Sequence, residues 1–391
     1  MKEWKSYKLG EISTIQTGPF GSQLHQSDYV ESGVPCIMPT NIGRMLDFQV
    51  AGIAHISESD ALKLSRHIVH EGDIVYSRRG DIEKCAYVSQ EQDGWFCGTG
   101  CLKITINSNL AVPKFVAYYL STDEIKSWIV GNAVGTTMLN LNTSVLADVP
   151  LSLPSIQMQK RCVQILDSIE NKIALNNRIN HNLEDCLFSL YIRLLENQCG
   201  LSTIGQVSER IYSGGTPDTK NSDFWGGAIN WLSSGETSER FIIDTEKRIT
   251  ENGVRHSSTK YASKYDVVIA SAGQGNTRGQ TSMTLLNTCI NQSVIVIHAN
   301  SVEAPAIFCS LANRYDELRA ISDASSIRGS LTTKMISALE IPIFPEVESV
   351  KFSSQAMCLI DQIENNLREN RSLKEQRDTL LPKLMGGELC K

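Results

Sequence analysis

Two segments of the chain carry apolar residues mostly at steps of three or four positions, over about ten or eleven helical turns each. In the segment from Ile156 to about Glu196, this stripe consists of Val163, Leu166, Ile169, Ile173, Ile179, Leu183, Leu187, Leu190 and Leu194. In the segment from about Ser349 to Leu384, it consists of Phe352, Ala356, Leu359, Ile363, Leu367, Leu373, Leu380 and Leu384. Residues at this spacing share one face of an α-helix, so each segment predicts one helix of about 40 residues. A long helix with one narrow apolar stripe pairs with another helix.

The two helical segments repeat each other. Residues 165–173 align without a gap on residues 359–367. The identical pairs are Asp167/Asp361, Ile169/Ile363, Glu170/Glu364, Asn171/Asn365 and Asn176/Asn370. We therefore expect the two helices to pair with each other as an antiparallel coiled coil, which would place the two globules at opposite ends of a rod. The stripes are interrupted at Asn176 and Asn370, which are either ordinary surface residues or a polar pair that fixes the register.

The helices separate two globular segments, so the chain is organised as globule, helix, globule, helix. We expect a first domain at 1–154, a helical spacer at 155–198, a second domain at 199–345 and a second spacer at 346–391. Strands are predicted at 72–77 and 101–106 in the first globule, and at 265–270 and 293–297 in the second. Short helices are predicted at 113–121 and 304–313. The fold class is therefore mixed α/β, with a repeated framework and loops that differ.

Composition narrows the class of protein. With 391 residues and 41% hydrophobic residues, the chain has room for two domains, each with its own core. The first residues are polar, no apolar run is long enough to span a membrane, and the eleven cysteines form no CxxC pair. We therefore expect no signal peptide, membrane anchor, disulfide framework or metal site, and a cytoplasmic location.

Charge gives no simple sign of nucleic-acid binding. Residues 1–150 contain 12 Lys and Arg against 16 Asp and Glu, and residues 201–345 contain 13 against 14. A protein that bound DNA through bulk positive charge would be basic. If this chain binds DNA, its cations must gather on one face, or partners must neutralise part of the phosphate charge.

Motifs for catalysis are missing. The sequence lacks the Asn/Asp-Pro-Pro-aromatic loop that holds a flipped adenine, a GxxxxGK[ST] loop for ATP, HExxH and Gly-x-Ser-x-Gly. The GxG fragments at 98–100 and 273–275 are more typical of turns than of nucleotide sites. We therefore expect no enzymatic activity from the isolated chain.

Recognition of base edges and phosphates requires loops that carry Arg, Lys, Asn, Gln, Ser or Thr. In the first globule the candidates are Gln23, Asn41, Arg44, Ser77, Arg78, Arg79 and Lys84. In the second globule they are Thr216, Lys220, Ser234, Gln274, Asn276, Arg278 and Arg328. The Arg78-Arg79 pair is the strongest local candidate because a strand exit presents it next to Gly80. Trp225 and Trp231 are expected in the core rather than stacked on DNA.

The chain resembles the specificity subunit of type I restriction–modification systems over its whole length. The resemblance is carried by Gly214-Gly215-Thr216-Pro217, by the segment 224–231 (Phe-Trp-Gly-Gly-Ala-Ile-Asn-Trp) and by the ending 380–389 (Leu-Leu-Pro-Lys-Leu-Met-Gly-Gly-Glu-Leu). The first globule departs from this pattern, because 17–21 (Thr-Gly-Pro-Phe-Gly) replaces the glycine turn and no Trp-Gly-Gly follows.

The resemblance implies that each globule reads one half of a split, asymmetric sequence in double-stranded DNA. It also implies that the helices set the spacer and dock two modification (methyltransferase) subunits, which restriction (translocase and nuclease) subunits join. S-adenosylmethionine, ATP and magnesium would belong to those partners, so this chain itself needs no cofactor. Three alternatives remain at this point: a stand-alone two-headed DNA-binding regulator, a protein scaffold without nucleic acid, and a fused methyltransferase, which the missing motifs disfavour.

Overall fold

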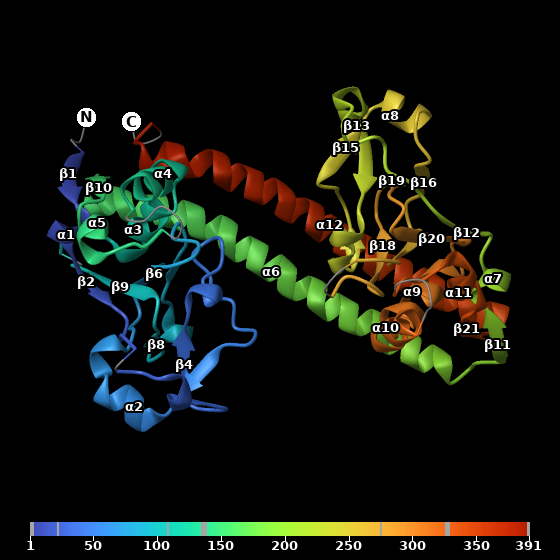
Figure 1. Ribbon diagram of the computed structural model, residues 1–391, viewed down its shortest axis with the longest axis horizontal. Coiled ribbons are helices and arrows are strands. Elements are labelled where there is room, and N and C mark those ends of the chain that lie inside the picture. Colours follow the sequence, from blue (N-terminus) through green and yellow to red (C-terminus); the bar gives the residue numbers. More distant parts are fainter. Residues whose placement is uncertain are drawn as a thin grey trace. The chain divides into compact units, whose positions relative to one another are not determined.

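The computed structural model describes residues 4–21, 23–107, 109–133, 139–273, 276–324 and 329–388. The chain divides into two compact units, one formed by Met1–Lys172 with Leu373–Lys391 and the other by Ile173–Ser372. The two predicted long helices are confirmed as α6 (Ile156–Leu195) and α12 (Glu346–Met385). Each unit therefore contains one globule together with a part of both long helices (Figure 1).

The first unit is built on two small sheets. The larger sheet has the order β2-β9-β6-β7 and is antiparallel throughout, and the smaller has the order β3-β5-β4-β8, with β4 and β8 parallel. A further antiparallel pair, β1 with β10, joins the two ends of the globule's chain. The strands are β1 (Lys5–Lys8), β2 (Ser13–Thr17), β3 (Tyr29–Val30), β4 (Val34–Ile37), β5 (Ala54–Ile56), β6 (Ile74–Ser77), β7 (Cys85–Tyr87), β8 (Phe96–Cys97), β9 (Cys101–Ile106) and β10 (Pro150–Leu153).

Five short helices complete the first globule, and the long helices close its core. The short helices are α1 (Leu9–Ile12), α2 (Glu58–Lys63), α3 (Pro113–Leu120), α4 (Asp123–Asn132) and α5 (Thr143–Ala147). Tyr76 of β6 and Phe115 of α3 are fully buried in one cluster with Leu166 of α6 and Leu381 of α12. Burying large apolar side chains is the dominant favourable term, so this cluster holds both long helices on the globule.

The second unit repeats this framework with a different edge. Its larger sheet, β12-β20-β17-β18-β14, begins with the same succession of strands as the first, whereas its smaller sheet has the order β15-β13-β19-β16. The strands are β11 (Gly200–Thr203), β12 (Arg210–Ser213), β13 (Trp225–Leu232), β14 (Phe241–Ile242), β15 (Lys247–Ile249), β16 (Lys260–Ala262), β17 (Val267–Ala270), β18 (Thr281–Thr284), β19 (Thr288–Ile290), β20 (Val294–His298) and β21 (Glu340–Ile343). The pair β11–β21 corresponds to β1–β10.

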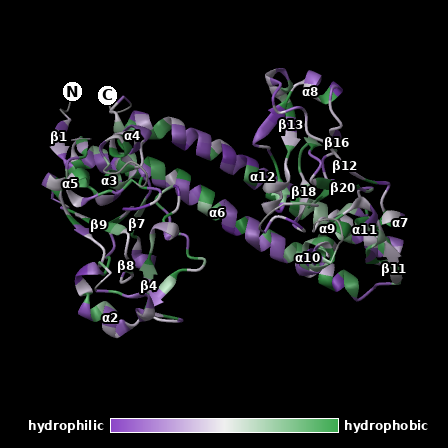
Figure 2. Ribbon diagram, viewed as in Figure 1, coloured by the Kyte–Doolittle hydropathy of each residue, from purple (hydrophilic) through white to green (hydrophobic). Residues whose placement is uncertain are grey.

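The helices of the second globule are α7 (Ile204–Val207), α8 (Glu251–Arg255), α9 (Ala304–Ala312), α10 (Tyr315–Asp323) and α11 (Thr333–Ala338). Its core includes Ile269 of β17 and Phe308 of α9, packed with Leu187 of α6 and Ile360 of α12. Where they lie outside these cores, the long helices are largely hydrophilic (Figure 2). The predicted strands and short helices of both globules are present, with ends that differ by one or two residues.

The residues that are identical in the helix repeat attach the helices in similar ways. Asp167 accepts a hydrogen bond of 2.8 Å from the hydroxyl of Tyr118, and Asp361 accepts one of 2.9 Å from the hydroxyl of Tyr265. Glu170 pairs with Arg377 at 3.0 Å, whereas Glu364 pairs with a lysine of its own globule and with an arginine of its own helix. The repeat therefore preserves the acidic attachment points while their partners differ.

Within each unit α6 and α12 run antiparallel, as predicted. In the second unit Asn176 bonds to Asn370, and Asn180, further along α6, bonds to Asn366, which precedes Asn370 in α12. All four side chains are buried, so the interpretation of Asn176 and Asn370 as surface residues is wrong. The predicted stripe also needs one correction, because Asn180 is buried where Ile179 was expected.

Candidate nucleic-acid interface

Arg78 leaves the end of β6 and is held by several contacts. Its backbone N–H donates to the carbonyl of Gly100 at 2.8 Å, and its own carbonyl accepts from the N–H of Leu141 at 3.0 Å. Its side-chain Nε donates to Oδ1 of Asn140 at 3.2 Å. The guanidinium lies 5.1 Å from the ring centroid of Phe20, whose side chain is half exposed. These contacts orient the guanidinium and reduce the entropy that it would lose on binding a ligand.

Arg79 is exposed, and no acidic partner is found for its guanidinium among the described residues. Burial, and after it the nearby charge of Arg79, lowers the pKa of Arg78. The adjacent Gly80 has a φ of +74°, a conformation that favours glycine, and a Cβ there would meet open space. The turn therefore presents two cations next to a backbone that another molecule can approach closely.

Two candidates of the first globule have internal roles, which corrects the expectation that they face DNA. The fully buried Ser77 donates its hydroxyl to the carbonyl of Arg79 at 2.9 Å, so it supports the turn. The buried Asn41 accepts from the N–H of Met38 at 2.9 Å and donates to the carbonyl of Gln49 at 3.0 Å. Both side chains are engaged by the fold and lie away from solvent.

The other candidates of the first globule are exposed or paired. Gln23 is exposed, and its Oε1 accepts a bond of 3.4 Å from the N–H of Phe20, so it lies close to the arginine turn. Lys84 pairs with Asp81 at 3.1 Å. An exposed ion pair of this kind contributes little to stability, and the lysine can still turn towards a phosphate.

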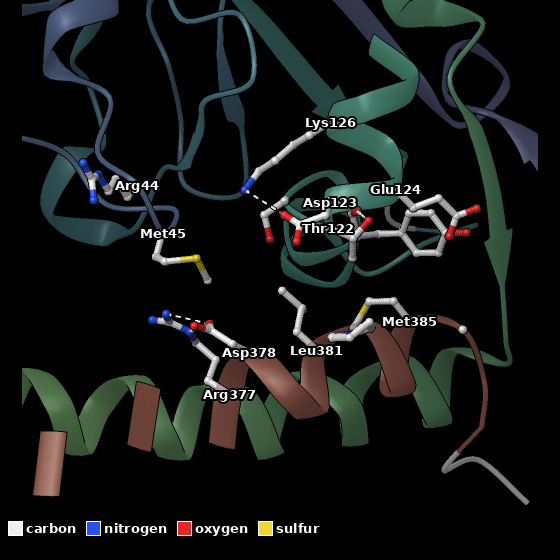
Figure 3. A pocket seen from close by; sticks show the side chains of 14 residues that line it. Arg44, Met45, Thr122, Asp123, Glu124, Lys126, Arg377, Asp378, Leu381 and Met385 are labelled. Atoms are coloured by element: carbon white, nitrogen blue, oxygen red, sulfur yellow. Dashed lines mark hydrogen bonds and ion pairs between the residues drawn. The ribbon is translucent and has the colours of Figure 1, made fainter. Parts of the chain in front are cut away.

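Arg44 lies at a separate cavity of the first unit, which has a volume of about 420 Å³ (Figure 3). This cavity is lined by apolar side chains, including Met45 and Leu381, and by charges of both signs. The charged lining residues are Arg44, Asp123, Glu124, Lys126, Arg377 and Asp378. Because three cations face three carboxylates, this cavity does not favour an anion, and Arg44 is not brought together with Arg78 and Arg79 by any contact of the described residues.

In the second globule the glycine turn after β12 is dictated by close packing. A Cβ on Gly214 would lie 2.1 Å from the carbonyl oxygen of Ile290, and one on Gly215 would lie 2.0 Å from Oγ of Ser258. The first globule repeats this feature, because a Cβ on Gly18 would lie 2.1 Å from the carbonyl of Gly98. A glycine is therefore required at both turns by contact with a neighbouring chain segment.

Thr216 and Lys220 follow this turn. The hydroxyl of Thr216 is hydrogen-bonded to Oε1 of Gln292. Lys220 is exposed, and its backbone N–H is held by the carboxylate of Asp218 at 3.0 Å. The carbonyl of Ser234, which is half buried, accepts from the hydroxyl of Thr237 at 2.8 Å. Among these three residues, Lys220 is the cation, and its side chain is exposed.

Arg278 is used mainly inside the second globule. Its guanidinium forms an ion pair with Asp323 and donates to the carbonyl of Gly329 at 2.5 Å, and only 13% of its side chain is exposed. Arg278 therefore contributes to the packing of its own globule, and its role as a DNA contact stays a prediction. Asn276 is exposed, and its carbonyl accepts from the hydroxyl of Tyr315 at 2.8 Å. Gln274 and Arg328 lie outside the described residues.

The two tryptophans pack against each other with ring centroids 5.1 Å apart and planes at 85°. Trp231 is 4% exposed and donates its indole N–H to the carbonyl of Gly215. Trp225 donates to the carbonyl of Asp218 at 3.1 Å, and the amine of Lys247 lies 5.9 Å from its ring centroid. Trp231 is therefore a core residue as predicted, and Trp225 supports the loop that carries Lys220.

The structure adds residues that were absent from the predicted set. Phe20 and Asn140 hold Arg78, and Gln292 holds Thr216. A phenylalanine between two glycines, at 18–21, is a signal that could have identified the first, since an apolar ring in a polar turn invites an unusual contact. Nothing in the local sequence identifies Asn140, because it lies 62 positions from Arg78.

Over the described part of the chain, no group of three potential ligands is arranged to hold a metal ion. Among the same residues, no helix is long and apolar enough to cross a membrane. The buried thiol of Cys97 has its pKa raised to about 12 by burial, so it would not be a nucleophile at neutral pH. The polar loops therefore remain the candidate interaction surfaces of both globules.

Comparison with known proteins agrees with this arrangement. Residues 1–185 match the family described as the type I restriction modification DNA specificity domain. The chain is 21% identical to the HindI specificity subunit of Haemophilus influenzae, with full coverage of both chains, and 21% identical to the MjaIX specificity subunit of Methanocaldococcus jannaschii, covering 99% and 94%. Among solved structures, the S subunit of a type I system from M. genitalium has a TM-score of 0.63 at 16% identity, covering 98% of this chain and 96% of its own.

The solved structure supports the fold, and the matched family and the full-length relatives support the resemblance. The predicted resemblance is thereby confirmed. Residues 1–185 carry the type I restriction modification DNA specificity domain, and the whole chain is similar to specificity subunits of type I restriction enzymes.

Proposed function

We propose that this chain gives a type I restriction–modification complex its DNA sequence specificity, with each globule reading one half of a bipartite, asymmetric site. The observation that carries this proposal is a repeated frame with different loops. Both globules keep the same succession of strands in the larger sheet and the same close-packed glycine turn, but their smaller sheets end on different edge strands, β3 and β16, and their exposed polar side chains differ. Two related readers with different surfaces suit two different half-sites.

In the first globule, Arg78 and Arg79 are proposed to make the main contacts. An arginine in the major groove can donate two hydrogen bonds to O6 and N7 of guanine. Arg78 is the better candidate for this role because Asn140 and Phe20 hold its plane. Arg79 is exposed and suits a phosphate. Gln23 bonds to Phe20, whose ring lies against Arg78, and Lys84 pairs with Asp81, two residues after Arg79. Arg44 is the weakest candidate, because its cavity carries charges of both signs.

In the second globule, the proposed contacts are Lys220, Thr216 and Ser234 on the loops that follow β12 and β13, and Asn276 after β17. Lys220 is exposed and would contact a phosphate, whereas the hydroxyls can bond to phosphates or base edges. Gln274 and Arg328 remain candidates from the sequence alone. Arg278 would act indirectly, through its contacts with Gly329 and Asp323 inside the second globule.

The chain is non-catalytic and is proposed to act with partners. Two modification subunits would dock on it and methylate DNA, and restriction subunits would cut unmethylated DNA in the cytoplasm. S-adenosylmethionine, ATP and magnesium would be bound by those partners. The net charge of −6 supports this division of labour, because other subunits can supply part of the positive charge that neutralises the phosphates.

Methylome sequencing of cells that carry the modification subunits, with and without this chain, tests the proposed function. We expect a split adenine-methylation motif that appears only when the chain is present. A gel shift adds a second test, since we expect the chain to bind DNA tightly only with the modification subunits. Tight, sequence-specific binding by the chain alone would instead support a stand-alone regulator.

Helix length offers a further prediction under the same proposal. Insertion of seven residues into α6 between Ile169 and Leu190 is expected to change the spacer that the complex accepts, while both half-sequences stay the same. The physical reason is that seven helical residues add about 10 Å, or about three base pairs of DNA. Altered bases at an unchanged spacing, read from the methylome, would contradict this view of the helices.

A further inference from the structure

The helix pair of the second unit contains a set of four buried asparagines, which we call the asparagine ladder. It consists of Asn176 and Asn180 on α6 and Asn366 and Asn370 on α12, which are 0–6% exposed. Nδ2 of Asn176 donates to Oδ1 of Asn370 at 2.9 Å, and Nδ2 of Asn366 donates to Oδ1 of Asn180 at 2.8 Å. Two successive positions of the stripe on each helix are thus polar and face each other.

Neighbouring polar groups extend the asparagine ladder. Asn370 also donates to Oδ1 of Asn177 at 2.8 Å, and Asn176 also donates to Oε2 of Glu369 at 2.7 Å. Gln362 donates to Oδ1 of Asn366 at 3.1 Å. Each asparagine of the ladder therefore finds a partner in the observed alignment of the helices, and most of those partners come from the opposite helix.

The asparagine ladder is not the most stabilising set of residues for this helix pair. Oδ1 of Asn176 and Nδ2 of Asn180 are buried without a hydrogen-bond partner in the described part of the chain. An unpaired buried polar atom is costly, and leucines at these positions would bury apolar surface instead. In coiled coils, polar residues of this kind stabilise one alignment relative to the others at a cost in overall stability.

The asparagine ladder disfavours alignments in which one helix is shifted along the other by one heptad. A shift in one direction would place Asn370 opposite Leu183 and Asn366 opposite Leu187. A shift in the other direction would place Asn176 opposite Ile363 and Asn180 opposite Leu359. In either case at least two buried amides would lose their partners to apolar side chains, whereas a stripe of leucines would accept either shift.

We propose that the asparagine ladder is a register lock that restricts α6 and α12 to one alignment and so restricts the DNA spacer to one length. The part that concerns the spacer rests on the proposed function; the part that concerns register does not. A slip by one heptad displaces one helix along the other by about 10 Å, which equals about three base pairs. The four asparagines are therefore specificity determinants that do not touch DNA.

The register is measured on the full chain by electron–electron distance spectroscopy. Spin labels are placed at Arg178→Cys on α6 and Asn365→Cys on α12, which are both exposed in the second unit. The exposed native cysteines Cys186, Cys199 and Cys358 are replaced with serine in every sample, and so is Cys390, which is not among the described residues. The parent chain is expected to give one narrow distance distribution.

The test variant changes all four ladder residues to leucine, and a second variant changes only Asn176 and Asn370 to alanine, which removes amides without enlarging the apolar surface. Both are expected to add a second population of label distances, from chains in which one helix is offset along the other by about 10 Å. The matched control is Asn171→Leu, an exposed asparagine of α6, which should keep the parent distribution. If the leucine and alanine variants keep one narrow distribution, the globules alone set the register and the proposal fails.

The consequence for DNA is measured separately. Complexes assembled with the modification subunits are offered duplexes that carry the same half-sites with spacers three base pairs shorter, unchanged or three longer. The parent should methylate one spacer, and the leucine variant should lose at least tenfold of this selectivity. A broadened distance distribution with unchanged spacer selectivity would overturn the link to DNA, whereas absence of methylation by the parent would overturn the proposed function and leave the lock standing.

Discussion

Replacing Arg78 and Arg79 with alanine should weaken DNA binding through one half-site only. Both residues lie in one turn of the first globule, which belongs to the first unit. The complex should therefore lose affinity on the half-site that the first globule reads. Recognition of the other half-site, and the accepted spacer, should not change.

The expected magnitude differs for the two arginines. An arginine that donates two bonds to guanine contributes about 1–3 kcal/mol of discrimination, which corresponds to about 5–150-fold in affinity. Arg78 is expected in this range, because its plane is held by Asn140 and Phe20. A phosphate contact by Arg79 should weaken binding on every sequence and reduce the slope of log K against log salt by about 0.9.

The assay is fluorescence anisotropy of the complex with its modification subunits, at several salt concentrations. Three duplexes are compared: one intact, one with the first half-site scrambled and one with the second scrambled. Arg44→Ala is the matched comparison, since Arg44 is an exposed arginine of the same globule that lies beside a cavity of mixed charge. Thermal unfolding should show a loss of only about 1–2 kcal/mol for the double variant, from the contacts of Arg78.

Two outcomes would refute this reasoning. Equal loss of affinity on both half-sites would mean that the arginines act on general charge rather than on one target. No loss on either would remove the turn after β6 from the DNA interface altogether. A loss confined to one half-site, but with an unchanged salt slope, would exclude Arg79 as a phosphate contact.

Three further predictions concern the frame and its thiols. Gly214→Ala should destabilise the second unit by about 1–3 kcal/mol in denaturant unfolding, because its Cβ would lie 2.1 Å from a carbonyl oxygen, whereas Gly21→Ala, which meets open space, should have little effect. Tyr118→Phe should lower the unfolding free energy of the first unit by about 1–2 kcal/mol, measured in the same way, since it removes a hydrogen bond to a carboxylate of α6. Iodoacetamide at pH 8 should label the exposed Cys186 in the native chain but label Cys36 only after unfolding. The reason is that burial raises the pKa of Cys36 to about 12. Mass spectrometry of native and unfolded samples would measure the labelling of each cysteine.

The sequence predicts the frame of this protein well for a physical reason. Apolar residues at helical spacing over about eleven turns fit only one regular structure, the α-helix. The ends of α6 and α12 therefore agree with the predicted ends within about three residues. The antiparallel pairing follows from the repeat. Short strands such as β6 and β17 are also predictable, because β-branched residues follow an aspartate in both globules.

The candidate interface is less predictable because residue type does not reveal where a side chain lies. Ser77, Asn41 and Arg278 have the chemistry of DNA contacts, yet each satisfies backbone groups of its own globule. The partners that decide this are distant in sequence; Arg278 is held at Asp323, 45 positions away. The burial of Asn180 was also not predicted, because the periodic pattern favoured Ile179 for the stripe.

The two halves differ most where they would touch DNA and least where they hold the helices. Arg78 and Ser271 occupy the same place in the two frames. The N–H of each donates a hydrogen bond of 2.8 Å to the opposite strand or its loop, and the carbonyl of each accepts a hydrogen bond from the N–H of a leucine. One position thus carries a guanidinium in one globule and a hydroxyl in the other without a change in the backbone bonds around it. By contrast, Asp167 and Asp361 are identical and both accept from a tyrosine hydroxyl. Under the proposed function, a frame that fixes the backbone at these positions while the residue type varies would allow each half to acquire its own target.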